Sequence, residues 1–444
     1  MKRSTIAALA GPSALGLLAV SGPAWAQAAD AQTVEQLQAV IKQQQQQLED
    51  QAKILQTLQQ QVDAIQRSTQ EAQQTAVQAE TKAEAAQAAV VGDGEAVVTS
   101  GQKNIELAIS GQVNRAINFA NGGGGTDAFF VDNDVSNSRF RLVGTGEVNE
   151  DLTLGSTIEI AVSPNNSSDV SQNNEDSGDN FDQRKVEVYG TSKRFGRLML
   201  GKGQAASDDT AEYDLSGVDV IMYSGIADIA GGLQFRNSDG GGLSGIRVDD
   251  AFFNFDGLGR RDRVRYDTPV FGPGLQRSGT AASDSRYDVA LTFGGDYGAW
   301  SGVDAGPFTM LGAVALADPN QNNNDYRLDG SASFLHNPSG LNLTFSAGMD
   351  KNDEGGNPSN QYAKLGWDAG NRLTSWGDSR FGVDATRGNN QPNGGSESFS
   401  VGGAFVQTIS DYGTELYTQV RWYTLDNANV DDLVVGTVGS RIKF

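Results

Sequence analysis

The sequence predicts an all-β transmembrane barrel of sixteen antiparallel strands, preceded by an N-terminal α-helical coiled coil. Two observations predict the barrel. From Ser285 to Phe444, apolar residues take every second position of successive short segments, and Asp, Asn, Ser, Gly, Gln, Lys and Arg fill the others. A period of two indicates strands with one apolar and one polar face. The chain is also only 38% hydrophobic and contains 55 glycines, which is poor material for one large soluble β core.

Strand length and aromatic positions favour a membrane barrel over a soluble β sandwich. The strands run to about ten residues, the length that crosses a bilayer at a tilt. A sandwich would bury its apolar faces against each other, whereas a barrel turns them outward to lipid around a polar lumen. Aromatic residues near strand ends suit the membrane–water interface, and they are Tyr287, Tyr362, Trp367, Trp422 and Tyr423.

Residues 1–26 have the features of a secretory signal peptide. Lys2 and Arg3 form a charged start, and the apolar stretch from Ile6 to Val20 is too short for a membrane helix. Ala24-Trp25-Ala26 is a cleavage site of the A-x-A type. No later segment resembles a membrane-spanning helix, so the sequence predicts export to the outer membrane.

Residues 27–91 predict a coiled coil, because they lack Gly and Pro and keep a seven-residue repeat. Val34, Ile41 and Leu48 occupy successive a positions, although Gln44 and Gln51 weaken the d positions. A coiled coil needs other copies, so the segment predicts a periplasmic rod in an oligomer. The alternative is a flexible polar linker that is helical only in part. Residues 92–103 form the linker to the barrel, residues 104–444.

Composition argues against several functions. The chain has no cysteine and a single histidine, His336, which makes a disulfide, a multi-histidine metal site or a histidine-based catalytic triad implausible. We therefore expect no enzyme activity, no metal and no cofactor. The formal net charge of −22 argues against nucleic acid as a partner. It does not decide the ion preference of a pore, which depends on the charges at the narrowest point.

Five strands are expected before a break in the alternating pattern, two after it and nine from Ser285 onward. The first covers residues 105–119, and the glycine run Gly122–Gly125 is expected to open a long loop. The second to fifth lie near residues 139–145, 158–162, 184–191 and 196–203, and the next two near 260–269 and 275–281. The total is even, as bacterial barrels require.

The break begins with an acidic segment, Ala205 to Gly225. It is too apolar for a solvated loop and too irregular for a strand, so we expect it to fold back into the lumen. Its apolar residues would then pack on the wall and its carboxylates would face the channel. The alternatives are a surface loop or a calcium-binding loop, although the spacing does not match an EF-hand. The acidic residues are Asp208, Asp209, Glu212, Asp214 and Asp219.

Several motifs resemble those of the general porins of Gram-negative outer membranes. They are Ser110-Gly-Gln-Val-Asn-Arg115, Ser138-Arg-Phe-Arg-Leu-Val-Gly144, Phe195-Gly-Arg-Leu-Met-Leu-Gly-Lys202, Arg263-Val-Arg-Tyr-Asp-Thr-Pro-Val-Phe271 and the terminal Phe444. Each is weak, but their order and spacing from about Ile105 to Phe444 are specific. Phe444 is similar to the outer-membrane assembly signal, which implies the barrel-assembly machinery as a partner.

The resemblance implies a homotrimer of barrels in outer-membrane lipid, each with its own pore narrowed by an inward third loop. Carboxylates on that loop would face a ladder of basic residues on the wall. By position the ladder is Arg141, Lys185, Lys202, Arg263 and Arg265, all expected on the lumen face. Asp267 stands where the family often has a basic residue, so this chain departs from the family pattern at the upper end of the ladder. Many general porins lack the coiled coil.

The expected function is passive diffusion of small hydrophilic solutes and ions, with a preference for cations suggested by the acidic loop. One alternative is a porin selective for phosphate, a sugar or an amino acid, for which Arg327, Arg380 and Arg421 are the candidate lumen arginines. Another is a structural tether from the outer membrane to the cell wall through the rod. A trimeric adhesin is disfavoured, because each chain has enough strands for its own barrel.

Overall fold

The computed structural model describes Lys42 and residues 104–178, 180–272, 274–296, 299–300, 302–319, 324–352, 356–426 and 428–444. Lys42 is helical and exposed. The predicted signal peptide (1–26), coiled coil (27–91) and linker (92–103) otherwise lie outside the described residues. Within those residues no helix has the length and apolar character needed to cross a membrane.

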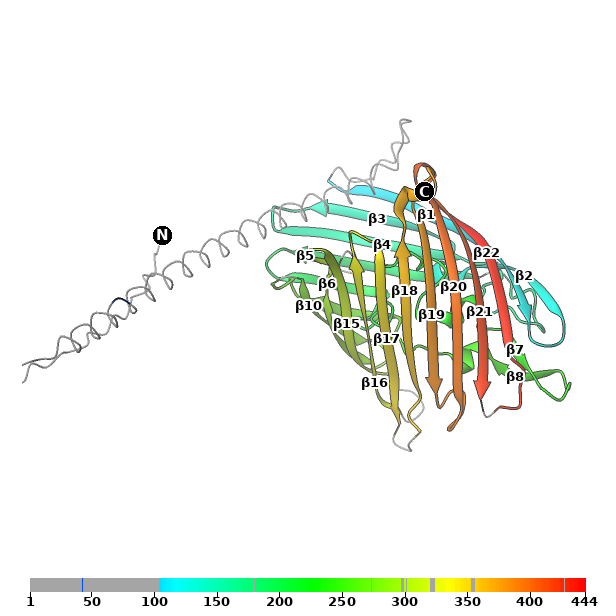
Figure 1. Ribbon diagram of the computed structural model, residues 1–444. Coiled ribbons are helices and arrows are strands. Elements are labelled where there is room, and N and C mark those ends of the chain that lie inside the picture. Colours follow the sequence, from blue (N-terminus) through cyan, green and yellow to red (C-terminus); the bar gives the residue numbers. More distant parts are fainter. Residues whose placement is uncertain are drawn as a thin grey trace, which may run out of the picture. The chain divides into compact units, whose positions relative to one another are not determined.

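One antiparallel sheet closes on itself, because β1 pairs with β22 as well as with β2 and β3. Neighbouring strands follow one another in the chain, and β16 to β22 stand side by side along one wall (Figure 1). The strands of this sheet are β1 (Glu106–Asn121), β2 (Thr126–Asp132), β3 (Arg139–Glu147), β4 (Leu152–Val162), β5 (Phe181–Ser192), β6 (Gly196–Gln204), β9 (Arg260–Asp267), β10 (Leu275–Ala282), β11 (Tyr287–Phe293), β14 (Val303–Ala305), β15 (Phe308–Asp318), β16 (Asn324–His336), β17 (Leu341–Asn352), β18 (Ser359–Asp368), β19 (Ser379–Asn389), β20 (Glu397–Ile409), β21 (Thr414–Asp426) and β22 (Leu433–Lys443).

Two interrupted strands bring this sheet to sixteen strands within the described residues. β2 and β3 pair with successive parts of β1 and are separated only by the short helix η1 (Asp134–Ser136). β11 and β14 likewise both pair with β15, and the small hairpin of β12 (Gly295–Asp296) and β13 (Ala299–Trp300) separates them. The predicted barrel of sixteen strands is confirmed, with five strands before the break, two after it and nine from Tyr287 onward.

The expectation of a long loop at Gly122–Gly125 is wrong. These residues close a tight hairpin, and the chain returns at once as β2, whose Asn121↔Thr126 pair abuts the turn. Gly123 and Gly125 have φ angles of 89° and 118°, which a side chain would resist. The four glycines therefore allow a reversal rather than a flexible tip. The long connections are residues 163–180 and 205–259.

The two faces of the wall differ as the alternating pattern requires. Val188, Leu198 and Leu200 face outward and are 56%, 55% and 57% exposed. The inward residues of the same strands and of β16 and β17 are mostly polar, with Ser331, Ser333 and Thr344 buried beneath the loop inside the barrel. An apolar exterior and a hydrogen-bonded closed sheet are what a lipid environment demands.

Phe444 completes the seam of the barrel. Its backbone exchanges two hydrogen bonds with Gly111 of β1, with N···O distances of 2.7 and 3.0 Å. A side chain at position 111 would meet the phenyl ring of Phe444 at 2.7 Å, so the glycine makes room for the ring.

Replacing Phe444 with Asp is expected to lower the yield of folded barrel in the outer membrane several-fold, because the closing contact loses its ring. The measurement is the heat-modifiable band on a gel of outer-membrane fractions. Phe444→Tyr keeps the ring and serves as the control. Equal yields of the Asp variant and the native chain would refute a role for Phe444 in assembly.

Candidate pore constriction

Residues 205–259, between β6 and β9, form a long loop, called here the inner loop, most of which packs against the inner face of the barrel, while the tip between β7 and β8 is exposed. It contains η2 (Ile226–Ile229), β7 (Gln234–Arg236), β8 (Leu243–Arg247) and the one-turn helix α2 (Val248–Ala251). β7 and β8 lie beside β21 and β22 (Figure 1), where Asn237 bridges to Val430. The expected inward loop is thus present and extends well beyond Gly225.

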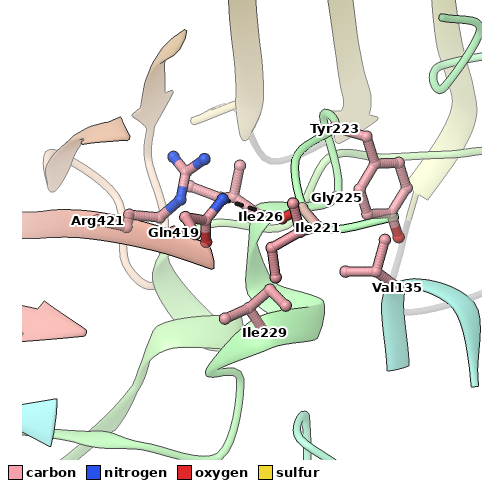
Figure 2. Close-up of a pocket in the computed structure, with 8 residues that line it drawn as sticks. All are labelled: Val135, Ile221, Tyr223, Gly225, Ile226, Ile229, Gln419 and Arg421. Atoms are coloured by element: carbon pink, nitrogen blue, oxygen red, sulfur yellow. Dashed lines mark hydrogen bonds between the residues drawn. The ribbon is translucent and has the colours of Figure 1, made fainter. Parts of the chain in front are cut away.

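The apolar side of the inner loop packs on the wall. Ile221, Met222, Leu233, Phe235 and Phe252 are at most 1% exposed. They share one cluster with inward residues of β1, β2, β18, β20, β21 and β22. Figure 2 shows Ile221, Ile226 and Ile229 gathered beside Gln419, whose amide donates to the Ile221 carbonyl at 2.9 Å. Apolar packing and backbone-directed hydrogen bonds therefore hold the loop in place.

On another part of the wall, formed by β3, β4 and β5, a cluster of arginine side chains surrounds Glu159. Glu159 is 1% exposed and contacts three arginines: Arg139 at 3.6 Å, Arg141 at 2.5 Å and Arg184 at 2.7 Å. These residues come from β3, β4 and β5, which lie side by side. One carboxylate cannot balance three guanidinium groups, so this part of the wall carries excess positive charge.

Gln204 links the wall to the inner loop. Lys185 of β5 donates to the Gln204 side-chain oxygen at 2.8 Å, and the Gln204 amide nitrogen donates to Asp209. Gln204 ends β6, immediately before the loop. The side-chain amide of Gln204 therefore lies between the Lys185 ammonium group on the wall and the Asp209 carboxylate on the loop.

The start of the inner loop brings carboxylates together. One oxygen each of Asp208, Asp209 and Asp256 lies within 4.8 Å of the other two. The Asp256 carboxylate accepts from the backbone N–H groups of Asp209 and Ala211. Glu212 accepts from the Asn254 amide at 2.8 Å. These contacts fold the two ends of the loop into one acidic surface.

Burial and mutual repulsion make these carboxyl groups hard to ionise. Burial, followed by the neighbouring Asp208, raises the pKa of Asp209 to about 6. The pKa of Asp228 rises to about 7 through burial and the charge of Asp134. Burial and acidic neighbours hold the pKa of Glu212 and Asp256 well above the usual range. The negative charge of the loop therefore depends on pH near neutrality.

Two predicted acidic residues have different surroundings. Asp214 is 2% exposed and forms an ion pair with the equally buried Lys364 of β18. It also accepts from Thr344 and Ser216, so it anchors the loop to the wall and does not face an open channel. Asp219 lies between the buried Val218 and Val220 but is itself exposed.

The residues of the predicted basic ladder do not form one group. Arg141 and Lys185 lie beside Glu159, but Arg263 is 1% exposed and pairs with Glu187 at 2.6 Å. Arg265 donates to Asp267 at 2.8 Å, so this acidic residue balances the charge of Arg265. Arg263 and Arg265 thus belong to ion pairs within the wall.

The prediction that Lys202 faces the lumen is wrong. Lys202 pairs with Val186 across β5 and β6, and directly paired residues lie on one face of a sheet. Val186 is 43% exposed on the outer surface. Lys202 also follows Leu198 and Leu200 at every second position of β6, so all three side chains lie on one face. Its ammonium nitrogen lies 3.9 Å from a carboxylate oxygen of Asp182. It therefore belongs to the outer face of the barrel.

The alternation of inward and outward positions along a strand could have identified two residues of this charged cluster that the sequence analysis missed. Arg139 shares its face with Arg141, and Glu159 lies between the outward Ile158 and Ile160. Arg184 was hidden, because a bulge in β5 turns both Arg184 and Lys185 towards Glu159. Asp256 lies close to Asp209 only because the end of the inner loop folds back beside its beginning.

The three arginines considered for a substrate path are all paired. Arg327 binds Asp350 through two N–H groups at 2.7 and 2.9 Å, and Arg380 contacts Asp368 and Asp378. Arg421 is buried against Asp384. Each of these three charges is therefore balanced by a neighbouring carboxylate.

A closed barrel with an apolar exterior, a polar interior and a charged inner loop defines an outer-membrane channel. The family model described as Gram-negative porin matches residues 75–428, and the chain belongs to that family. Porins form channels in the outer membrane for passive diffusion. The long connections at 163–180 and 205–259 therefore start from the extracellular side, and the chain ends at the periplasmic side.

Two solved structures illustrate the likeness in fold. The anion-selective porin from Comamonas acidovorans has 16% sequence identity and a TM-score of 0.51, and the match covers 77% of this chain and 100% of that one. A loop L8 deletion mutant of OmpT, an outer-membrane protein of Vibrio cholerae, has 10% identity and a TM-score of 0.50, with the same coverage. No curated protein matches the sequence.

Proposed function

We propose that this porin sorts small hydrophilic solutes by charge at a constriction between the Glu159 cluster and the acidic part of the inner loop. The observation that carries the proposal is the opposition of the two surfaces across Gln204, with Lys185 on one side and Asp209 on the other. Opposed charges create a transverse field, which orients dipolar solutes and disfavours apolar ones. At neutral pH and above, the loop carboxylates give the pore a preference for cations.

The family resemblance supports a homotrimer, with one pore in each chain. The predicted signal peptide (1–26) and periplasmic coiled coil (27–91) fit this assembly, because a three-stranded rod suits three barrels whose N-termini share one side of the membrane. These assignments rest on the sequence.

Single-channel recording of the full chain in a planar bilayer tests the proposal, with a KCl gradient to obtain the reversal potential. We expect large ohmic steps in groups of three and a potential of the sign that cation preference produces. A potential of the opposite sign would show that the wall arginines dominate. Folded, heat-modifiable protein without conductance would refute the open pore.

Cation preference is expected to fall when the pH is lowered from 8 to 5. Asp209 and Asp228, with pKa values of about 6 and 7, gain protons in this range, while the wall arginines stay charged. The loop therefore loses negative charge as pH falls through these values. The reversal potential, measured at fixed salt gradient across this range, checks the expectation.

Asp209→Asn should flatten that pH dependence. The matched control is Asp219→Asn, which removes an exposed carboxylate of the same loop outside the Asp208–Asp209–Asp256 group. It should lower cation preference at every pH without moving the midpoint. A reversal potential that is constant from pH 8 to 5 in the native chain would contradict the assignment of the titrating groups.

A further inference from the structure

One aromatic side chain of the inner loop is open to water. Among the large apolar side chains of residues 205–259, that of Phe253 alone is more than a third exposed, at 42%. Its neighbours Phe252 and Phe255 are 0% and 3% exposed. A phenyl ring left in water gives up the free energy that burial provides, so a solute that covers the free face of Phe253 is stabilised there.

The Phe253 ring is held in a defined place. Its backbone N–H donates to the Gln391 side-chain oxygen at 2.9 Å, and the Gln391 amide donates back to its carbonyl at 3.3 Å. Gln391 lies in the turn between β19 and β20, on the extracellular side. The Phe255 ring meets the Phe253 ring edge to face at 5.0 Å, and the Arg327 guanidinium lies 5.0 Å from the Phe253 centroid. Phe253 therefore presents a positioned aromatic surface near the extracellular entrance of the pore.

Excess positive charge lies at the end of the inner loop. Arg261 of β9 and Arg286 share one carboxylate, that of Asp284, at 3.5 and 3.1 Å. Arg261 also donates to the Leu258 carbonyl at 3.0 Å, and Arg327 donates at 2.8 Å to the carbonyl of the residue before it. The Arg261 side chain is 31% exposed, so a solute can reach it. One carboxylate cannot balance two guanidinium groups, so the carboxylate of a solute is attracted here.

Carboxylates flank the same segment. The first residues of the inner loop run beside its last ones, because the Ala205 N–H donates to the Gly259 carbonyl at 3.1 Å. Asp256, three residues after the exposed ring, forms the acidic group with Asp208 and Asp209. An aromatic surface, excess positive charge and a group of carboxylates therefore occur together where the inner loop rejoins the wall.

We propose that this end of the inner loop is a subsite for aromatic zwitterions of the amino-acid type, with the solute ring on the free face of Phe253 and its carboxylate on Arg261 and Arg286. The ammonium group of the solute points to the acidic group around Asp256. Arginine binds carboxylates in a fork of two hydrogen bonds, and paired rings gain stability beyond the area that they bury. The subsite deepens the proposed function, because it rests on an open pore with opposed charges.

Block of the single-channel KCl current of the full chain tests the proposal, with L-phenylalanine as the probe. We expect saturable interruptions of the current. L-Cyclohexylalanine, which has the same charges without an aromatic ring, should need about a fivefold higher concentration for half-maximal block. 3-Phenylpropionate lacks the ammonium group and phenethylamine lacks the carboxylate, so each should also bind about fivefold more weakly.

Variants assign the contacts to residues. Phe253→Ala should raise the concentration of L-phenylalanine for half-maximal block about fivefold, and Phe253→Tyr, which keeps the ring, should restore native block. Arg286→Gln should weaken block by L-phenylalanine and by 3-phenylpropionate but not by phenethylamine. Phe399→Ala is the matched control, because Phe399 is 41% exposed on the outer face of β20, and it should leave the block unchanged. Heat-modifiability reports that each variant is folded.

Three outcomes would overturn the proposal. Equal block of the native chain and Phe253→Ala by L-phenylalanine would refute the contact with the ring. Equal block of the native chain by L-phenylalanine and 3-phenylpropionate would refute the contact with the acidic group. A native pore that conducts with cation preference but is not blocked by L-phenylalanine would exclude the subsite and leave the proposed function standing, whereas folded protein without conductance would refute both.

Discussion

Replacing Glu159 with Gln is expected to shift the pore strongly towards anions. Glu159 is the carboxylate that Arg139, Arg141 and Arg184 share, so its neutralisation leaves their charge uncompensated. A unit charge about 6 Å from a permeating ion contributes about 0.7 kcal/mol at the dielectric constant of water, or a factor of about three. Cations and anions respond in opposite directions, so the permeability ratio should change about tenfold. The reversal potential in a KCl gradient measures it.

Folding must be checked in the same variant, because removing one partner of a buried ion pair costs about 3–5 kcal/mol. Heat-modifiability reports whether the barrel has formed, and Glu159→Asp, which keeps the charge, should recover the native ratio. Glu147→Gln is the matched control, since Glu147 is an exposed residue at the periplasmic end of β3. If Glu147→Gln shifts the ratio as much as Glu159→Gln, the selectivity reflects net charge and not the constriction.

Replacing Phe252 with Ala is expected to loosen the inner loop while the barrel remains folded. Phe252 is 0% exposed and meets Tyr423 of β21 edge to face, with ring centroids 5.4 Å apart. Truncating a buried phenylalanine costs about 3–5 kcal/mol, and here the cost falls on the packing of loop against wall. We expect noisier and larger single-channel currents and faster protease cleavage within residues 205–259.

The adjacent Phe253 offers a matched control, because it is 42% exposed and stacks near Arg327 rather than in the apolar cluster. Phe253→Ala removes the same side chain and should leave the loop resistant to protease. If the two variants behave alike, or if Phe252→Ala leaves both current noise and cleavage unchanged, the apolar cluster does not hold the loop.

The candidate site was predictable only where the alternating pattern was regular. The faces of their strands predict the inner side of the wall for Arg141 and Lys185, and both lie beside Glu159 there. The same rule, applied with care, excludes Lys202. The bulge that turns Arg184 inward leaves no mark in the sequence, because it depends on the register with β4. Asp214 looked like its acidic neighbours, but its contact with Lys364 depends on how the loop crosses β18.

By itself, the sequence determined the barrel, its sixteen strands and the presence of an inward loop. Period-two alternation is a local property, and each strand carries it independently of its neighbours. Only the tertiary structure decided which charges meet. Glu159 collects arginines from two neighbouring strands, and Asp256 joins Asp209 after the loop returns. Such contacts join residues that are far apart in the chain, and strand register and loop packing decide them.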